Sequence, residues 1–177
     1  AHALGDRIRS RDQLERALEP GKYTVVLEPT CVASMVLSLV SSMDARSADE
    51  GRSFFSAPGG KNRQGEQLLP DGVSIVSDPT AKNAPGLPWE GEGLPQRRRD
   101  WIQQGRVSTL ACDRFWAEKT GREAIPRPSN ILMAGGQGSL AELIASTERG
   151  VLITSLWYIR MVDPRTLVLT GLTRDGV

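Results

Sequence analysis

The sequence predicts an α+β fold, a largely antiparallel β-sheet packed by two or three helices. Two observations predict it. Short β-branched and aromatic segments are interspersed with two segments of helical period, and the last third of the chain holds two long strand-like segments joined by the turn sequence Asp163-Pro164-Arg165. The 177 residues suffice for one hydrophobic core, so residues 1–177 are treated as one domain, with an N-terminal helical segment (1–20) and a main region (21–177).

Periodicity predicts the elements of the first half. A charged helix over residues 4–19 ends at Pro20-Gly21, and a β-branched strand follows at 23–27. The clearest helix comes next, because a set of apolar residues falls on one face of a 3.6-residue period: Val32, Met35, Val36, Leu39, Val40 and Met43. Leu37 widens this face, which predicts a helix buried on more than one side.

Residues 51–72 are expected to be irregular, because Gly, Pro and Asn interrupt them. The elements predicted after them are a strand at 73–76, a hairpin of 97–103 and 106–110, a helix at 111–119 stopped by Gly121, a strand at 130–133, a helix from 140, and two long strands at 151–161 and 166–172. Ser139 and Glu142 have the capping-box spacing for the helix from 140, and Gly150 is its predicted stop. Its predicted buried face consists of Leu140, Leu143 and Ile144.

Composition narrows the class of protein. Lys and Arg (22) nearly balance Asp and Glu (21), and a net charge of +1 gives no electrostatic reason to expect nucleic acid or a membrane surface as a partner. Cys31 and Cys112 lack metal-ligand spacing, which favours a reducing compartment. The N-terminus has no signal pattern, and the longest apolar stretch, 32–40, is too short to span a bilayer. We therefore expect a cytoplasmic protein.

Histidine content limits the chemistry of this sequence. The only histidine is His2, whereas a hydrolytic zinc site needs three protein ligands from His, Cys, Asp and Glu. Ser–His–Asp and Cys–His nucleophilic catalysis require a histidine as well. The residues alone therefore favour a binding or scaffold protein with no catalytic and no metal-ligating residue.

Three further patterns have both a chemical and a structural interpretation. Cys31 at a helix start has the setting of a reactive thiol, but a small buried residue is the simpler reading. Residues 135–138, Gly-Gly-Gln-Gly, precede a helix like a phosphate-binding loop, but they lack the remaining residues of such a motif. Glu90, Glu92 and Asp100 are paired carboxylates in a Gly- and Pro-rich loop, with no other catalytic partner.

Several segments resemble the TldD/PmbA family, whose members are often described as modulators of DNA gyrase. The similar segments lie in the expected order at 23–29, 49–56, 78–79, 91–95, 140–154, 157–167 and 169–176. In that family one branch resembles a zinc peptidase with an HExxxH helix, and the PmbA or TldE branch lacks the motif and pairs with the first. Family members normally have a further N-terminal domain and a further strand, so this sequence resembles the C-terminal half.

The family's strand-then-helix pattern, laid onto residues 25–27, puts the HExxxH positions at Leu37, Ser38 and Ser42. None of these residues is a zinc ligand, so the resemblance implies the non-catalytic branch. It further implies an HExxxH-bearing partner subunit that carries the zinc, and an extended peptide held in a chamber between the subunits. A homodimer, a metallopeptidase in its own right, and a regulator that binds gyrase without proteolysis are the alternatives.

Candidate peptide- or partner-binding residues come from three segments, whose charged and aromatic side chains could contact an extended chain: Asp49, Glu50, Arg52, Arg97, Arg99, Trp157 and Arg160. Each segment has a structural alternative as well. Residues 97–99 could form a solvated edge or local salt bridges, and residues 157–160 could form a core strand.

Overall fold

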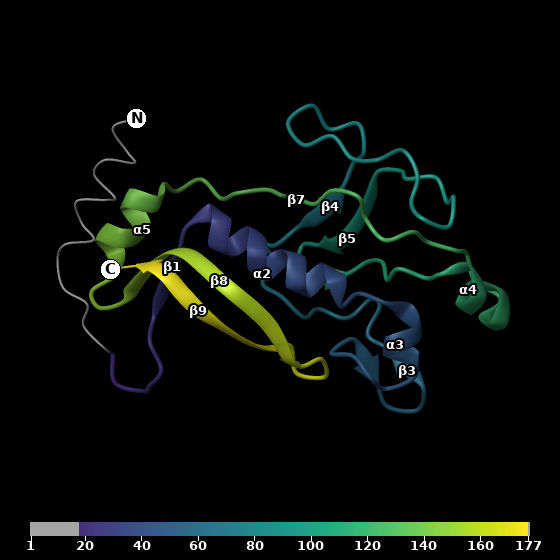
Figure 1. The fold of residues 1–177 in the computed structure, drawn as a ribbon, viewed down its shortest axis with the longest axis horizontal. Helices are drawn as coiled ribbons and strands as arrows, with labels where there is room; N and C mark the ends of the chain where they lie inside the picture. Colours follow the sequence, from purple (N-terminus) through teal and green to yellow (C-terminus); the bar gives the residue numbers. More distant parts are fainter. Residues whose placement is uncertain (1–17, 177) are drawn as a thin grey trace.

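The computed structural model describes residues 18–176 and has a mixed α and β fold with three sheets. All strand pairs but one are antiparallel, which confirms the predicted α+β class. The helix predicted over 4–19 lies outside the described residues except for its last two. Figure 1 shows two neighbouring parts, a long hairpin at one end and a second sheet with short helices at the other, with one helix running between them.

The long hairpin belongs to a three-stranded sheet in the order β1-β8-β9. Strand β1 (Val25–Leu27) pairs in parallel with β8 (Val151–Asp163), which pairs antiparallel with β9 (Val168–Gly176). The sequence predicted each of these strands. The pairing between β8 and β9 has several register shifts, and Tyr158 in β8 has a φ of 57°, which marks a bulged rather than a regular ribbon.

Helix α2 (Pro29–Ser41) follows β1 directly and lies along β8 (Figure 1). Glu28 is extended and Pro29 stands in the first turn, where its missing N–H costs no helical hydrogen bond. The predicted apolar face is confirmed for Val36, Leu39, Val40 and Met43, which lie in or against the main core. It is wrong for Met35, which is 43% exposed. The expectation of burial on further sides is wrong for Leu37, which is 58% exposed because no other described element covers that side of the helix.

The core lies against a four-stranded sheet in the order β6-β5-β4-β7. Its strands are β4 (Ile75–Ser77), β5 (Arg99–Gln103), β6 (Arg106–Val107) and β7 (Leu132–Met133). Trp101 is fully buried, and its indole N–H donates to Ser77 Oγ at 3.0 Å, which satisfies both polar groups inside the core. The predicted 97–110 hairpin is confirmed, with both turn residues, Gln104 and Gly105, at positive φ.

Short elements cover one end of this core. Helix α3 (Ala45–Asp49) is followed by a small hairpin of β2 (Ser56–Ala57) and β3 (Lys61–Asn62) in the stretch expected to be irregular. Helix α4 (Arg114–Thr120) begins later than predicted, because the Asp113 carboxylate caps it by accepting from Trp116 N at 2.6 Å. It ends as predicted at Gly121, which has a left-handed φ of 67°.

Helix α5 (Leu140–Ser146) begins with the predicted capping box between Ser139 and Glu142. Its predicted buried face is wrong, since Leu143 and Ile144 are 55% and 42% exposed. Its predicted stop is also wrong, because the chain leaves the helix at Thr147, which is extended. Gly150 instead allows close approach to β1, where an added Cβ would lie 3.0 Å from the carbonyl oxygen of Thr24.

Candidate functional site

The first predicted group lies at the end of α3, where Asp49 is the best-connected carboxylate. Its side chain is 8% exposed and forms an ion pair with Arg122 at 2.8 Å. The indole N–H of Trp116 donates to it at 2.8 Å, and Asn62 Nδ2 donates at 2.7 Å. Burial opposes ionisation, but the bonds from Trp116, Asn62 and Arg122 outweigh it, so the pKa of Asp49 is lowered. Asp49 joins α3, β3 and α4 and therefore has a structural role.

Glu50 and Arg52, the other members of this group, are on the surface. The Glu50 carboxylate pairs with Arg52 and with Arg46, the latter at 3.2 Å. Hydrogen bonds from Arg52 and Arg46 lower the pKa of Glu50. Both side chains face solvent and are available to a ligand or partner, although each already has an ionic partner.

The second predicted group consists of Arg97 and Arg99, which lie just before and at the start of β5 and have different surroundings. Arg99 pairs with Glu123 at 3.4 Å and is 24% exposed, so it forms the local salt bridge named as the alternative. Glu123 follows Arg122, the partner of Asp49, so the first two groups meet at consecutive residues. Arg97 precedes the strand and is exposed.

The third group lies on β8, and its exposure argues against the core-strand alternative. Trp157 is 52% and Tyr158 is 56% exposed. Arg160 donates to the Tyr158 hydroxyl and stacks over its ring, with the guanidinium carbon 4.1 Å from the ring centroid. Contact of Trp157 and Arg160 with a peptide remains a prediction.

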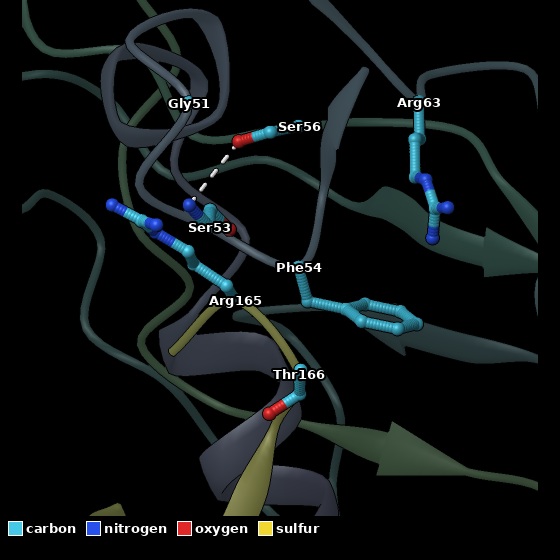
Figure 2. A pocket seen from close by; sticks show the side chains of 7 residues that line it. All are labelled: Gly51, Ser53, Phe54, Ser56, Arg63, Arg165 and Thr166. Carbon is cyan, nitrogen blue, oxygen red and sulfur yellow. Dashed lines mark hydrogen bonds between the residues drawn. The ribbon is translucent and has the colours of Figure 1, made fainter. Parts of the chain in front are cut away.

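A depression that the sequence did not indicate lies beside the first group. It has a volume of about 400 Å³, and Figure 2 shows the side chains around it. Its lining comes from the turn before β2, from the start of β2, from the loop after β3 and from the tip of the β8–β9 hairpin: Gly51, Ser53, Phe54, Ser56, Arg63, Arg165 and Thr166. The tip residues stand far along the chain from the others, so no local pattern could have predicted that they meet.

The three carboxylates suggested as an acid–base pair each have a different partner, and Asp100 lies in β5 rather than in the expected loop. Glu90 accepts from the backbone N–H of Glu92 at 2.8 Å, and Glu92 accepts from Arg114 N at 3.1 Å. Asp100 pairs with Arg98 at 3.6 Å. Each carboxylate therefore has its own structural partner.

Both cysteines are buried and free, and for Cys31 this agrees with its structural interpretation. Cys31 Sγ lies 3.3 Å from the carbonyl oxygen of Ile153, to which it donates. Burial raises the pKa of Cys112, so its thiol stays protonated near neutral pH. A nucleophilic role for either thiol has no support in these contacts.

The residues at the HExxxH positions do not fit zinc. Leu37 faces solvent, Ser38 Oγ donates to Ser34 O at 3.1 Å, and Ser42 Oγ donates to Ser38 O at 3.0 Å. Both hydroxyls thus bond back to the helix, as serines in helices often do. Between residues 18 and 176, no group of three or more His, Cys, Asp or Glu side chains is arranged to hold a metal ion. No helix in that part of the chain has the length and apolarity needed to cross a membrane.

These features define an α+β domain whose helix α2 carries no histidine or carboxylate. Residues 20–177 match the family model described as the PmbA/TldA metallopeptidase C-terminal domain, and the chain belongs to this family. The resemblance seen in the sequence is therefore confirmed. A comparison with curated protein sequences found no match.

Solved structures share the fold. A candidate modulator of DNA gyrase from Bacteroides thetaiotaomicron is 21% identical with a TM-score of 0.72, over 92% of this chain and 40% of the other. One from Thermotoga maritima is 25% identical with a TM-score of 0.67, over 81% and 34%. TldE from Thermococcus kodakarensis is 19% identical with a TM-score of 0.65, over 88% and 38%. The chain thus spans two fifths or less of the length of these proteins.

Proposed function

We propose that this chain is part of a non-catalytic partner subunit of a TldD-type zinc metallopeptidase in the cytoplasm, and that it helps to form the chamber that binds the peptide. The observation that supports this proposal most is helix α2, which carries no histidine or carboxylate. The family resemblance assigns the HExxxH positions to Leu37, Ser38 and Ser42, and none of these is a zinc ligand. In this proposal the partner holds the zinc and carries out hydrolysis, and this chain forms part of the chamber wall and contacts the peptide.

The similarity to TldE supports the non-catalytic assignment, because the family resemblance places TldE in the branch without the motif. Exposed apolar side chains support an interacting surface. On the β8–β9 hairpin they include Trp157, Val162, Val168 and Leu172, each at least half exposed. Trp157 and Leu172 are directly opposite each other across the hairpin. A set of large apolar side chains on one ribbon is typical of a surface that another protein covers.

The peptide part of the proposal is supported by the sheet order. Among the described strands β9 is at the edge of its sheet, with a row of backbone groups on its outer side. Such an edge can accept an extended peptide as an added strand. The exposed side chains of Trp157 and Arg160 on the neighbouring β8 are then available for side-chain contacts.

The test is gel filtration with light scattering on this protein mixed with its HExxxH-bearing relative from the same genome, with zinc measured in each peak. We expect a mixed complex with zinc only on the relative. Stoichiometric zinc on this protein alone, with no complex, would overturn the proposal in favour of a peptidase in its own right.

The gyrase-modulator names of two structural neighbours favour a second candidate, a regulator that binds gyrase without proteolysis. A pull-down with this protein as bait distinguishes the two. Gyrase recovered in the absence of any peptidase partner favours the regulator, and recovery of the HExxxH relative alone favours the partner subunit.

A further inference from the structure

The depression at the hairpin tip carries a local positive charge. Two of its lining side chains, Arg63 and Arg165, are basic and none is acidic. Two carboxylates lie close to these arginines but do not line the depression: Glu66 pairs with Arg63 at 3.6 Å, and Asp163 accepts from Arg165 N. A concave site with charge of one sign attracts ligands of the opposite charge.

Hydrogen bonds fix the two sides of the depression relative to each other. Phe54 N donates to the carbonyl oxygen of Pro164 at 2.7 Å, which ties the turn after α3 to the hairpin tip. Asp163 accepts from Arg165 N at 2.9 Å and holds the tip in its turn. Because the chain itself makes these bonds, a ligand that binds there has less of the site to order.

The donors in the depression remain available to a ligand. None of the ion pairs found among residues 18–176 involves the Arg165 guanidinium. Figure 2 shows its side chain among those that line the depression. Ser56 Oγ accepts from Ser53 N at 3.1 Å, so its hydroxyl hydrogen is free to donate. Arg63 lies over the Phe54 ring at 5.2 Å and pairs more loosely with Glu66, at 3.6 Å.

We propose that this depression binds a carboxylate of a peptide. Arg165 is the principal donor, because a guanidinium can donate two parallel hydrogen bonds to a carboxylate. Ser56 is a second donor, and the Phe54 ring packs against the aliphatic part of the ligand. The proposal rests on the proposed function in one respect, that the ligand is a peptide.

The experiment measures binding to the full chain by fluorescence anisotropy, with labelled peptides of equal length. One peptide has glutamates and an amidated end, one has glutamines and a free terminal carboxylate, and one has glutamines and an amidated end. We expect the neutral peptide to bind at least about tenfold more weakly than one of the other two. Whichever of these binds more tightly shows whether the carboxylate comes from a side chain or from the chain end.

Two variants test the site itself. Arg165→Gln should lower the affinity of the preferred acidic peptide about tenfold, to that of the neutral peptide. Arg149→Gln, an exposed arginine outside the depression, is the matched control and should leave the affinity unchanged. Circular dichroism checks that both variants fold. Arg63→Gln, measured in the same binding assay, tests the arginine on the opposite side of the depression.

Equal binding of acidic and neutral peptides overturns the proposal. Unchanged binding by Arg165→Gln overturns it as well. So does the absence of binding of any peptide up to about 1 mM, which we take as the limit for a weak specific site. None of these outcomes changes the result expected from gel filtration, which is a complex with zinc on the relative. Conversely, loss of that complex in gel filtration leaves direct peptide binding by the chain intact, so the two failures are distinguishable.

Discussion

At the scale of single residues, Asp49 is a largely buried carboxylate with three polar partners, and its ionisation should contribute to stability. Its carboxylate binds Arg122, Trp116 and Asn62, and its side chain is 8% exposed. Asp49→Asn removes the charge and turns one oxygen into a donor that faces other donors. We expect a loss of about 1–3 kcal/mol in the free energy of unfolding, measured by urea denaturation at pH 7. Glu50→Gln, next in the chain but on the surface, should have a much smaller effect.

The difference in unfolding free energy between wild type and Asp49→Asn should depend on pH, in the direction given by the sign of the Asp49 pKa shift. The pKa of Asp49 is lower in the folded state than the ordinary value of about 4 in the unfolded chain. Its contribution is therefore complete above that ordinary value and is lost as the pH falls through the folded pKa. Wild type and Asp49→Asn should converge in stability at acid pH. A difference that stays constant down to pH about 2 would contradict this assignment.

Arg160 tests the interpretation of β8 as a binding strand. Its guanidinium stacks on Tyr158 at the surface, so Arg160→Ala should cost less than about 1 kcal/mol of stability. If β8 contacts peptide, the same variant should bind a labelled peptide more weakly in the anisotropy measurement. A large loss of stability with unchanged peptide affinity would return this strand to a structural role.

At the scale of elements, the β5–β6 hairpin depends on a glycine for two separate reasons. Gly105 has a φ of 76°, and an added Cβ would clash with the carbonyl oxygens of Leu69 and Pro70, the latter at 2.7 Å. Gly65 has a similar φ of 90° with nothing within 4 Å, so it is a matched control. Both Ala variants carry the left-handed strain of about 1 kcal/mol, and Gly105→Ala should lose about 1–3 kcal/mol more in urea denaturation. Equal losses would mean that the loop around Leu69 simply moves away.

The elements also show what the sequence could predict. The period of α2, the Ser139–Glu142 capping box and the turn at Pro164 are local signals, and each gave the right element. Periodicity identifies an apolar face but does not say what covers it, so the predicted burial of Leu37 and Leu143 was wrong.

The same limit applies to the candidate site. Asp49, Glu50 and Arg52 were identified as one segment, but none of them lines the depression, whose lining from this segment is Gly51 and Ser53. Arg63 and Arg165, which complete this depression, come from distant segments that the hydrogen bond from Phe54 N to the Pro164 carbonyl joins. Contacts between distant segments leave no pattern in a single sequence.

At the scale of the whole molecule, the exposed apolar hairpin predicts an association that a single charge should weaken. Leu172 on β9 is 55% exposed and faces Trp157 across the strands. Leu172→Lys places a charge on that surface and should raise the dissociation constant of the complex with the HExxxH-bearing relative by at least about tenfold, because a buried unpaired charge is costly. Its effect on the stability of the isolated chain should stay below about 1 kcal/mol, since the side chain is already in water.

Leu143→Lys on α5 is the matched control for that variant, because Leu143 is also 55% exposed and lies on a different element. Light scattering at several concentrations gives both dissociation constants, and the self-association of each variant in the same runs tests for a homodimer. If only Leu172→Lys weakens the mixed complex, the β8–β9 hairpin forms the subunit contact. If both variants bind the relative like wild type, the hairpin does not form the subunit contact. Its exposed apolar side chains are then assigned to peptide binding at the β9 edge.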